Sequence, residues 1–156
     1  MSTLGTDPQS DSGRIVVGVD GSSHSKEALR WAVGQARLTG QPVEAVISWT
    51  IPVDYGMGAA GPLMSFDWEG VAKTTVQETV ETAVDASDAN RVSQRVVMGH
   101  PGQVLLDAAA DAALLVVGSR GRGGFKGMLL GSVSQSVIAR AACPVVVVRD
   151  PANPTE

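Results

Sequence analysis

The 156-residue chain has a single cysteine, Cys143, which excludes a disulfide within the chain and a metal site built on several thiolates. We expect this cysteine to be a small buried residue just before a strand. No apolar run approaches the roughly 20 residues that a helix needs to cross a bilayer. The first 13 residues also lack the basic and apolar regions of a signal peptide. These absences predict a cytoplasmic protein without a membrane partner.

Negative charge is missing from one long segment. The formal net charge is −4, which argues against general binding to nucleic acid or to anionic membranes. Between Asp111 and Asp150, however, the chain has no Asp or Glu, whereas five Lys and Arg residues fall there. This could be chance in a hydrophobic C-terminal region. The sharper interpretation is that the segment holds a small anion.

Aliphatic runs alternate with helical patterns along the chain. Strands are predicted at residues 14–20, 42–49, 91–99, 113–118 and 144–149. Helices are expected from Ser22 or Ser23 to a stop at Gly40, after Gly70 to about Ala86, from Pro101, and from Ser132. This order predicts an α/β fold: a single doubly wound domain with a five-stranded parallel sheet and helices on both faces. Ligands of such folds bind outside the carboxyl ends of the strands.

The expected domain covers residues 14–149, between a disordered N-terminal tail (1–13) and a C-terminal tail (150–156). Helical spacing places one set of side chains toward the core: Ala28, Leu29, Ala32, Val33, Ala36, Val76, Val80, Val84, Val133, Val137, Ile138 and Ala141. Trp31 and Trp49 are expected in the core or at an interface. His24 is expected to be exposed, and His100 to be a turn residue with a structural or solvent role.

The segment Gly118–Ser134, GSRGRGGFKGMLLGSVS, holds six of the chain's 18 glycines and the cations Arg120, Arg122 and Lys126. It leaves the fourth predicted strand and runs into the helix that begins at Ser132. A helix N-terminus offers unpaired N–H groups and a positive partial charge, so phosphate is its natural ligand. The alternative is an empty surface loop.

Individual residues of this loop suit a nucleotide. Gly131 would let phosphates approach the backbone, and the hydroxyls of Ser132 and Ser134 could donate to them. Gly118 and Gly121 would let the chain turn beneath a ribose or base without a side-chain clash. Two better-known phosphate motifs are excluded: no glycine is followed by Lys and then Ser or Thr, and GVDGSS after the first strand is not GxGxxG.

Gly118-Ser119-Arg120-Gly121, nine further residues and then Gly131-Ser132 match the pattern G-x2-G-x9-G-[ST]. The chain therefore resembles the ATP-binding universal stress proteins. The stretches VVGVDGS, MGHPGQVLLDAAADAALLVVGSRGRGG and LLGSVSQSVIARAACPVVVV are also similar to that family, so the resemblance covers Arg14 to Arg149. The chain departs from the family mainly in the segment Thr50–Gly70, a region that is generally variable there.

The resemblance implies a set of contacts with ATP, with Mg²⁺ as a possible companion. Asp20 would lie beside the adenosine and could bind the Mg²⁺, although it could instead be a turn residue at the helix entry. Ser48 would contribute a backbone contact to adenine. The expected binding residues are Gly18, Val19, Asp20, Ser48, Val117, Gly118, Ser119, Arg120, Gly121, Arg122, Gly123, Gly124, Gly131, Ser132, Val133 and Ser134. The resemblance also implies a homodimer formed by pairing of the last strands, Pro144 to Arg149.

The leading interpretation is an ATP-binding universal stress protein, a regulatory dimer acting in the stress response. A slow ATPase or phosphotransferase is the enzymatic interpretation, although no dedicated base is visible. A third interpretation is a sensor of another adenine nucleotide, such as AMP or cyclic AMP, and a fourth is a dimeric partner surface without a ligand. Tyr55, Phe66 and Trp68 could cover an adenine, or could pack their own loop onto its helix.

Overall fold

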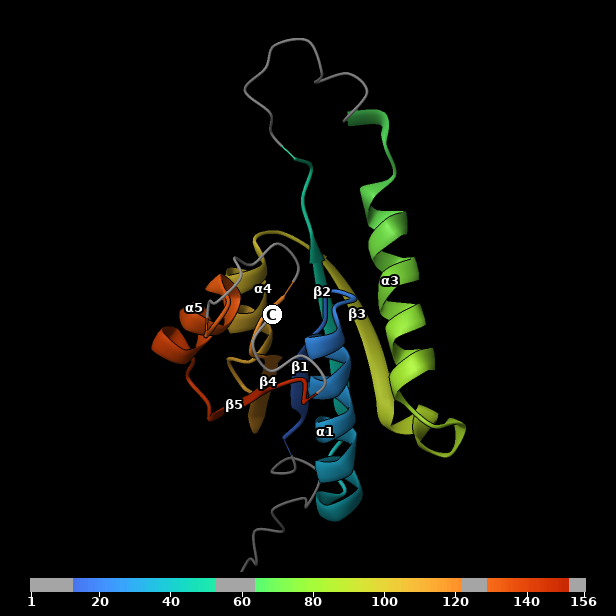
Figure 1. Cartoon of the computed structure of the whole chain (residues 1–156), viewed down its shortest axis with the longest axis vertical. Helices are drawn as coiled ribbons and strands as arrows, with labels where there is room; N and C mark the ends of the chain where they lie inside the picture. Colours follow the sequence, from blue (N-terminus) through green and yellow to red (C-terminus); the bar gives the residue numbers. More distant parts are fainter. Residues whose placement is uncertain (1–12, 53–63, 122–128, 152–156) are drawn as a thin grey trace, which may run out of the picture.

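The computed structural model describes residues 13–52, 64–121 and 129–151. Strands and helices alternate through these ranges, as the sequence predicts (Figure 1). The elements are β1 (Ile15–Gly18), α1 (Ser23–Thr39), β2 (Val43–Trp49), α3 (Trp68–Ala83), the 3₁₀ helix η1 (Ala86–Arg91), β3 (Val92–Met98), α4 (Pro101–Ala108), β4 (Leu114–Gly118), α5 (Ser132–Arg140) and β5 (Val145–Val148).

The five strands form one parallel sheet in the order β3-β2-β1-β4-β5. The winding direction reverses at β1, whose neighbours are β2 on one side and β4 on the other. Helices α1 and α3 cover one face of the sheet and α4 and α5 cover the other (Figure 1). The predicted doubly wound α/β fold is therefore confirmed, and the carboxyl ends of β1 and β4 meet at the switch point where such folds bind ligands.

Helix α1 shows how the sequence sets its own boundaries. The Ser22 hydroxyl accepts a hydrogen bond from the Ser25 N–H (3.2 Å) and so caps the helix start. Gly40 ends the helix in the left-handed conformation (φ 75°), and its N–H donates to the Ala36 carbonyl. Both boundaries agree with the sequence prediction.

The core has two layers, one on each face of the sheet. Between the sheet and α1/α3 lie the predicted core residues of both helices, together with Ile15, Val17 and Ile47; Trp31 and Trp49 pack against this layer as partly buried side chains. Val16, Leu105, Leu115 and Val137 lie in the second layer, under α4 and α5. β4 is buried by helices on both faces, as its continuous apolar sequence indicates.

Three side chains differ from the sequence prediction: Ile138, His24 and Cys143, for which the sequence predicts burial. Ile138 is 49% exposed rather than inward, because Val137 occupies the buried position of α5 and the next residue turns about 100° away from it. His24 is only 6% exposed, because the end of β4 and the backbone after β5 pack over the first turn of α1. Cys143 lies half-buried before β5.

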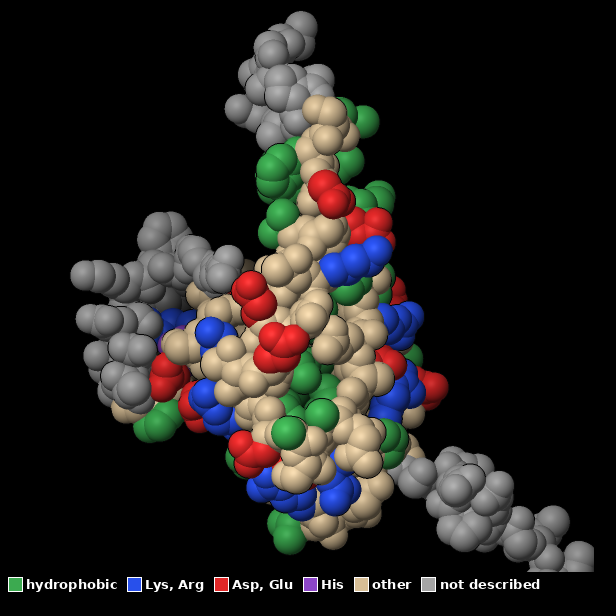
Figure 2. Space-filling model, turned by 90° about the vertical axis from the view of Figure 1, so that its right-hand side faces the viewer, with side chains coloured by type: hydrophobic (Ala, Val, Ile, Leu, Met, Phe, Trp, Pro, Cys, Tyr) green, Lys and Arg blue, Asp and Glu red, His purple; other side chains and the backbone are tan. Residues whose placement is uncertain are grey.

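Helix α3 extends beyond the body of the domain at its N-terminal end (Figure 1). Figure 2 shows acidic and basic side chains interspersed over the face that α1 and α3 cover, with hydrophobic ones gathered toward its narrow end. Met64, Phe66 and Val71, at or before the start of α3, are large hydrophobic side chains that are exposed. None of the helices in the described ranges is long and apolar enough to span a membrane.

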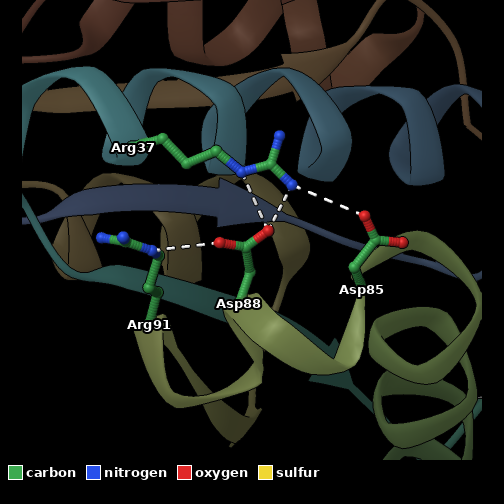
Figure 3. A network of polar contacts seen from close by, with 4 residues as sticks. All are labelled: Arg37, Asp85, Asp88 and Arg91. Atoms are coloured by element: carbon green, nitrogen blue, oxygen red, sulfur yellow. Dashed lines mark hydrogen bonds and ion pairs between the residues drawn. The ribbon is translucent and has the colours of Figure 1, made fainter.

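The far end of α1 is fixed to η1 by a charge network (Figure 3). Asp88 is buried, and its two oxygens accept hydrogen bonds from Arg37 Nε (2.9 Å) and Arg91 Nε (3.1 Å). Arg37 also lies 3.6 Å from the exposed Asp85. The hydrogen bonds from Arg37 lower the pKa of Asp88 below its usual value, against the opposing effect of burial, and Arg91 adds to the lowering.

We expect Asp88→Asn to destabilise the protein at neutral pH, because two arginines lose their shared anion. A lowered folded-state pKa contributes stability that is fully present above the unfolded value of about 3.9 and disappears as the pH falls through the folded value. The difference in unfolding free energy between wild type and variant should therefore be constant from about pH 7 to 5 and narrow below pH 4. Urea denaturation at several pH values measures it. Asp85→Asn is the control and should change stability less; a gap for Asp88→Asn that widens in acid would contradict this account.

Candidate functional site

A cavity of about 620 Å³ opens at the carboxyl edge of the sheet. The ends of β1, β2 and β4 form its floor, and the first residues of α3, α4 and α5 line it as well. Its size lies within the range of small-molecule sites. The cavity is therefore where the strand order predicts a ligand site.

One end of the cavity is the N-terminus of α5. Gly131 occupies the capping position with extended backbone (φ −71°, ψ 165°) and has no side chain to accept from the helix. The Gln135 N–H donates to the Gly131 carbonyl (3.0 Å) and is the first donor of the intrahelical ladder, so the N–H groups of Ser132, Val133 and Ser134 come before it and have no acceptor within the helix. Arg120, which is only 6% exposed, also lines the cavity. This end suits an anionic group.

Most of the predicted binding residues meet at this cavity. Those that line it are Gly18, Val19, Asp20, Ser48, Val117, Gly118, Arg120, Gly121, Gly131, Ser132, Val133 and Ser134. Arg122, Gly123 and Gly124 lie outside the described residues, as do Lys126 and Tyr55. Ser119 is buried and is absent from the described lining.

Ser119 and Ser134, the two buried serines among the predicted binding residues, direct their hydroxyls to other groups of the protein. Ser134 donates to the Gly118 carbonyl (2.6 Å), which ties α5 to the end of β4. Ser119 Oγ lies 3.3 Å from His24 Nδ1. The Ser134 hydroxyl is therefore engaged by the protein, and the donor that this residue presents toward the cavity is its backbone N–H. Ser132 is the exposed hydroxyl of this turn.

Asp20 combines a turn role with a place in the cavity wall. Its Oδ1 accepts from the Ser22 N–H (2.9 Å), and its own N–H donates to Ser25 Oγ (3.3 Å), so it shapes the entry to α1. Among the described lining residues Asp20 is the one carboxylate and Arg120 the one cation. The described residues contain no group of three His, Cys, Asp or Glu that could hold a metal ion. A Mg²⁺ ion here would rely on Asp20 together with oxygens of the ligand.

The three motif glycines differ in what a side chain at each position would meet. A Cβ on Gly118 would lie 2.7 Å from the His24 carbonyl carbon, so this glycine allows β4 to pack against α1. A Cβ on Gly121 would lie 2.4 Å from Asp20 Oδ2. A Cβ on Gly131 would meet nothing closer than 3.4 Å, and the backbone there is open to any residue. Gly131 is thus the motif glycine that the folded chain itself does not need.

The other end of the cavity is apolar and was not predicted as a site, apart from Trp68. Trp49 at the end of β2 and Trp68 at the start of α3 line it, together with Val71, Ala72 and Thr75. The Phe66 and Trp68 rings also contact each other, with centroids 4.5 Å apart. The glycine- and aromatic-rich composition of 50–70 marks this segment as unusual. The sequence does not show that the end of β2 and the start of α3 line one cavity, because that depends on how the two elements pack in the folded chain. The cavity therefore has one end suited to an anion and one suited to a flat apolar group.

A model of the Universal stress protein family matches residues 12–149. The chain is 37% identical to a universal stress protein of Mycolicibacterium smegmatis over 136 residues, which are 86% of this chain and 45% of that protein. It is 32% identical to a universal stress protein of Mycobacterium tuberculosis H37Rv over 151 residues, 92% of this chain and 47% of that protein. The chain thus spans about half the length of these curated relatives.

Solved structures agree in fold. UspA from Lactobacillus plantarum superposes with a TM-score of 0.75 at 22% identity, covering 88% of this chain and 98% of that one. The universal stress protein of Archaeoglobus fulgidus in complex with dAMP gives 0.60 at 27% identity (87% and 97%). A universal stress protein in complex with cAMP gives 0.56 at 25% identity (87% and 95%). The family match over nearly all of the described domain, the relatives and the shared fold together show that this chain belongs to the universal stress protein family.

Proposed function

We propose that this protein binds ATP in the cavity at the carboxyl edge of the sheet and acts as a nucleotide-dependent regulatory module. The observation that carries the proposal is the uncapped N-terminus of α5, with Gly131 at its tip and the buried Arg120 beside it. The match to G-x2-G-x9-G-[ST] supports it. The complexes of two structural relatives with dAMP and cAMP support an adenine nucleotide as the ligand class.

In this proposal the phosphates lie against the N–H groups of Ser132, Val133 and Ser134. The adenosine extends away from α5 past Asp20 and Ser48, and its base reaches the apolar end of the cavity. A purine offers a flat face, which suits stacking on an indole. Trp68, from α3, is our candidate for that contact. A bound Mg²⁺ would neutralise phosphate charge beside Asp20.

We propose binding rather than rapid turnover. Efficient phosphoryl transfer uses a placed metal together with a group that positions or activates the attacking nucleophile. The described lining residues include no histidine, and the Asp20 Oδ1 is already engaged by the Ser22 N–H. The described lining residues thus offer contacts for holding a nucleotide and few for activating water.

We expect Gly131→Val to fold normally and to lose nucleotide affinity at least tenfold, a change of about 1.4 kcal/mol. The branched side chain would stand where the phosphates approach α5, while the site accepts a Cβ without a close contact. Isothermal titration with ATP, ADP, AMP, dAMP and cAMP measures the affinity and ranks the ligands. Gly34→Ala, on α1 with open space around it, is the matched control.

Two results would overturn this proposal. Absence of binding by wild-type protein to any of the five nucleotides would remove the nucleotide module. Repeated turnover of ATP that disappears in Asp20→Ala would replace the binding module by an enzyme. Gly118→Val cannot serve as the test, because its side chain would collide with the α1 backbone and the loss of binding would follow from misfolding.

We expect a bound adenine nucleotide to quench the fluorescence of Trp68. The Trp68 indole lines the cavity, as does that of Trp49, whereas Trp31 belongs to α1 and packs against the core. Quenching on addition of nucleotide should persist in Trp31→Phe and shrink in Trp68→Phe. Trp68→Ala should also weaken binding of adenine nucleotides, by about 1–3 kcal/mol if the base stacks on this ring. Equal affinity in Trp68→Ala and wild type would place the base elsewhere.

We also propose a homodimer formed through β5. The strand lies at one edge of the sheet, and its four valines are only partly buried. The Leu115 N–H of β4 donates to the Pro144 carbonyl, and the Ser119 N–H, just after β4, donates to the Val148 carbonyl. Because backbone groups alternate in direction along a strand, those of Val145 and Val147 face away from β4. An apolar strand edge of this kind is a template for pairing.

The dimer predicts a mass in solution of twice the 16.1 kDa of the chain. Val147→Pro should convert it to a monomer, because proline removes an N–H that faces the partner and leaves the bonds to β4 in place. Light scattering measures the mass, and an unchanged circular dichroism spectrum shows that the variant is folded. A wild-type monomer, or a dimer that survives the substitution, would contradict pairing through this edge.

A further inference from the structure

Ser119 joins four parts of the fold at one residue. Its N–H donates to the Val148 carbonyl of β5 (2.7 Å), and its carbonyl accepts from the Gly131 N–H (2.8 Å) at the start of α5. Its hydroxyl lies 3.3 Å from Nδ1 of His24 on α1. Because Ser119 follows β4 directly, these contacts connect the sheet edge, the anion-binding end of the cavity and the first turn of α1.

His24 is the side chain that completes this junction. Its Nδ1 also accepts from the Asp150 N–H (3.2 Å), in the backbone just after β5. A backbone N–H can only donate, so Nδ1 is an acceptor and the proton of the neutral ring sits on Nε2. The ring is buried, and Asp150 is buried with it. His24 Nδ1 thus accepts a hydrogen bond from the backbone after β5 and lies beside the Ser119 hydroxyl after β4.

His24 does not itself line the cavity in the described structure, but the residues on either side of its partner Ser119 do: Gly118 and Arg120. Gly118 is also pressed against the His24 backbone, where a Cβ would lie 2.7 Å from the carbonyl carbon. The imidazole therefore contacts the cavity wall indirectly, through Ser119 and the backbone of 118–120.

We propose that His24 is a positioning residue for the nucleotide site: its Nδ1 holds Ser119, and hence Gly118, Arg120 and Gly131, in the geometry that receives phosphate, and couples that site to the end of β5. This inference rests on the proposed nucleotide binding. If the backbone at 118–120 and Gly131 is already held in place before the ligand binds, less conformational entropy is lost on binding. Because coupling is reciprocal, a bound nucleotide must in turn stabilise the backbone of 145–150.

Two substitutions of His24 distinguish the role of Nδ1 as a hydrogen-bond acceptor from the role of the side chain in packing. His24→Asn places Oδ1 on the same carbon that carries Nδ1, so it keeps an acceptor for Asp150 and Ser119. His24→Leu keeps an apolar side chain of branched shape and removes the acceptor. We expect ATP affinity to fall about tenfold in His24→Leu and to return to within about threefold of wild type in His24→Asn.

Asp88→Asn is the matched control for a loss of stability. It breaks another buried attachment of the same helix at its opposite end, remote from the cavity. At a temperature where all the variants are folded, Asp88→Asn should bind ATP as wild type does. A loss of affinity in Asp88→Asn equal to that in His24→Leu would show a general effect of destabilisation and would overturn the proposal.

Amide hydrogen exchange reads the coupling to β5. In wild type and His24→Asn, ATP should slow exchange at residues 145–150, whereas in His24→Leu saturated with ATP it should not. Equal affinity in His24→Leu and wild type, or an equal loss in both His24 variants, would refute the role of Nδ1. If wild-type protein binds no nucleotide, the proposed function fails first, and the exchange experiment distinguishes this because no segment is then protected.

Discussion

The close approach of β4 to the first turn of α1 is the contact on which the carboxyl edge of the sheet depends. Gly118 makes it possible, because any side chain there would enter the space of the His24 backbone. Once β4 ends at this position, Ser119 reaches Val148 on one side and Gly131 on the other. The Ser134 hydroxyl then closes the connection by donating to the Gly118 carbonyl. The placement of α5, and hence of its N-terminus, follows from these bonds.

This dependence divides the glycine motif into parts with different physical purposes. Gly118 serves the packing of the fold, and Gly121 leaves room for the Asp20 carboxylate. A Cβ on Gly131 would make only ordinary contacts, and the backbone conformation there is open to any residue, so the folded chain does not itself require glycine at this position. A pattern of glycines in a sequence does not distinguish these cases. The distances from each absent Cβ to its neighbours do.

The order of elements could be predicted because each depends on local sequence: apolar runs for strands, caps and periodicity for helices. Ser22 and Gly40 bound α1 through contacts within a few residues, and such signals are legible in sequence. The burial of His24 was predicted wrongly because its partners, Ser119 and Asp150, are 95 and 126 residues away along the chain. Ile138 was misplaced for a related reason, since the helical period allows two adjacent positions at the rim of an apolar face and only packing against α4 and the sheet selects between them.

The cavity also has one end that local sequence predicts and another that depends on contacts between distant parts of the chain. The end suited to an anion is lined by residues from 117–121 and 131–134, which lie near one another in the sequence, so its chemistry can be predicted from the sequence. Its apolar end comes from β2 and α3, whose residues Trp49 and Trp68 are 19 positions apart in the sequence and line the same cavity. In the proposed complex the adenine nucleotides would share their base and differ in the number and charge of their phosphates. The helix N-terminus and Arg120 would therefore rank the adenine nucleotides among themselves, whereas the apolar end would distinguish adenine from other groups.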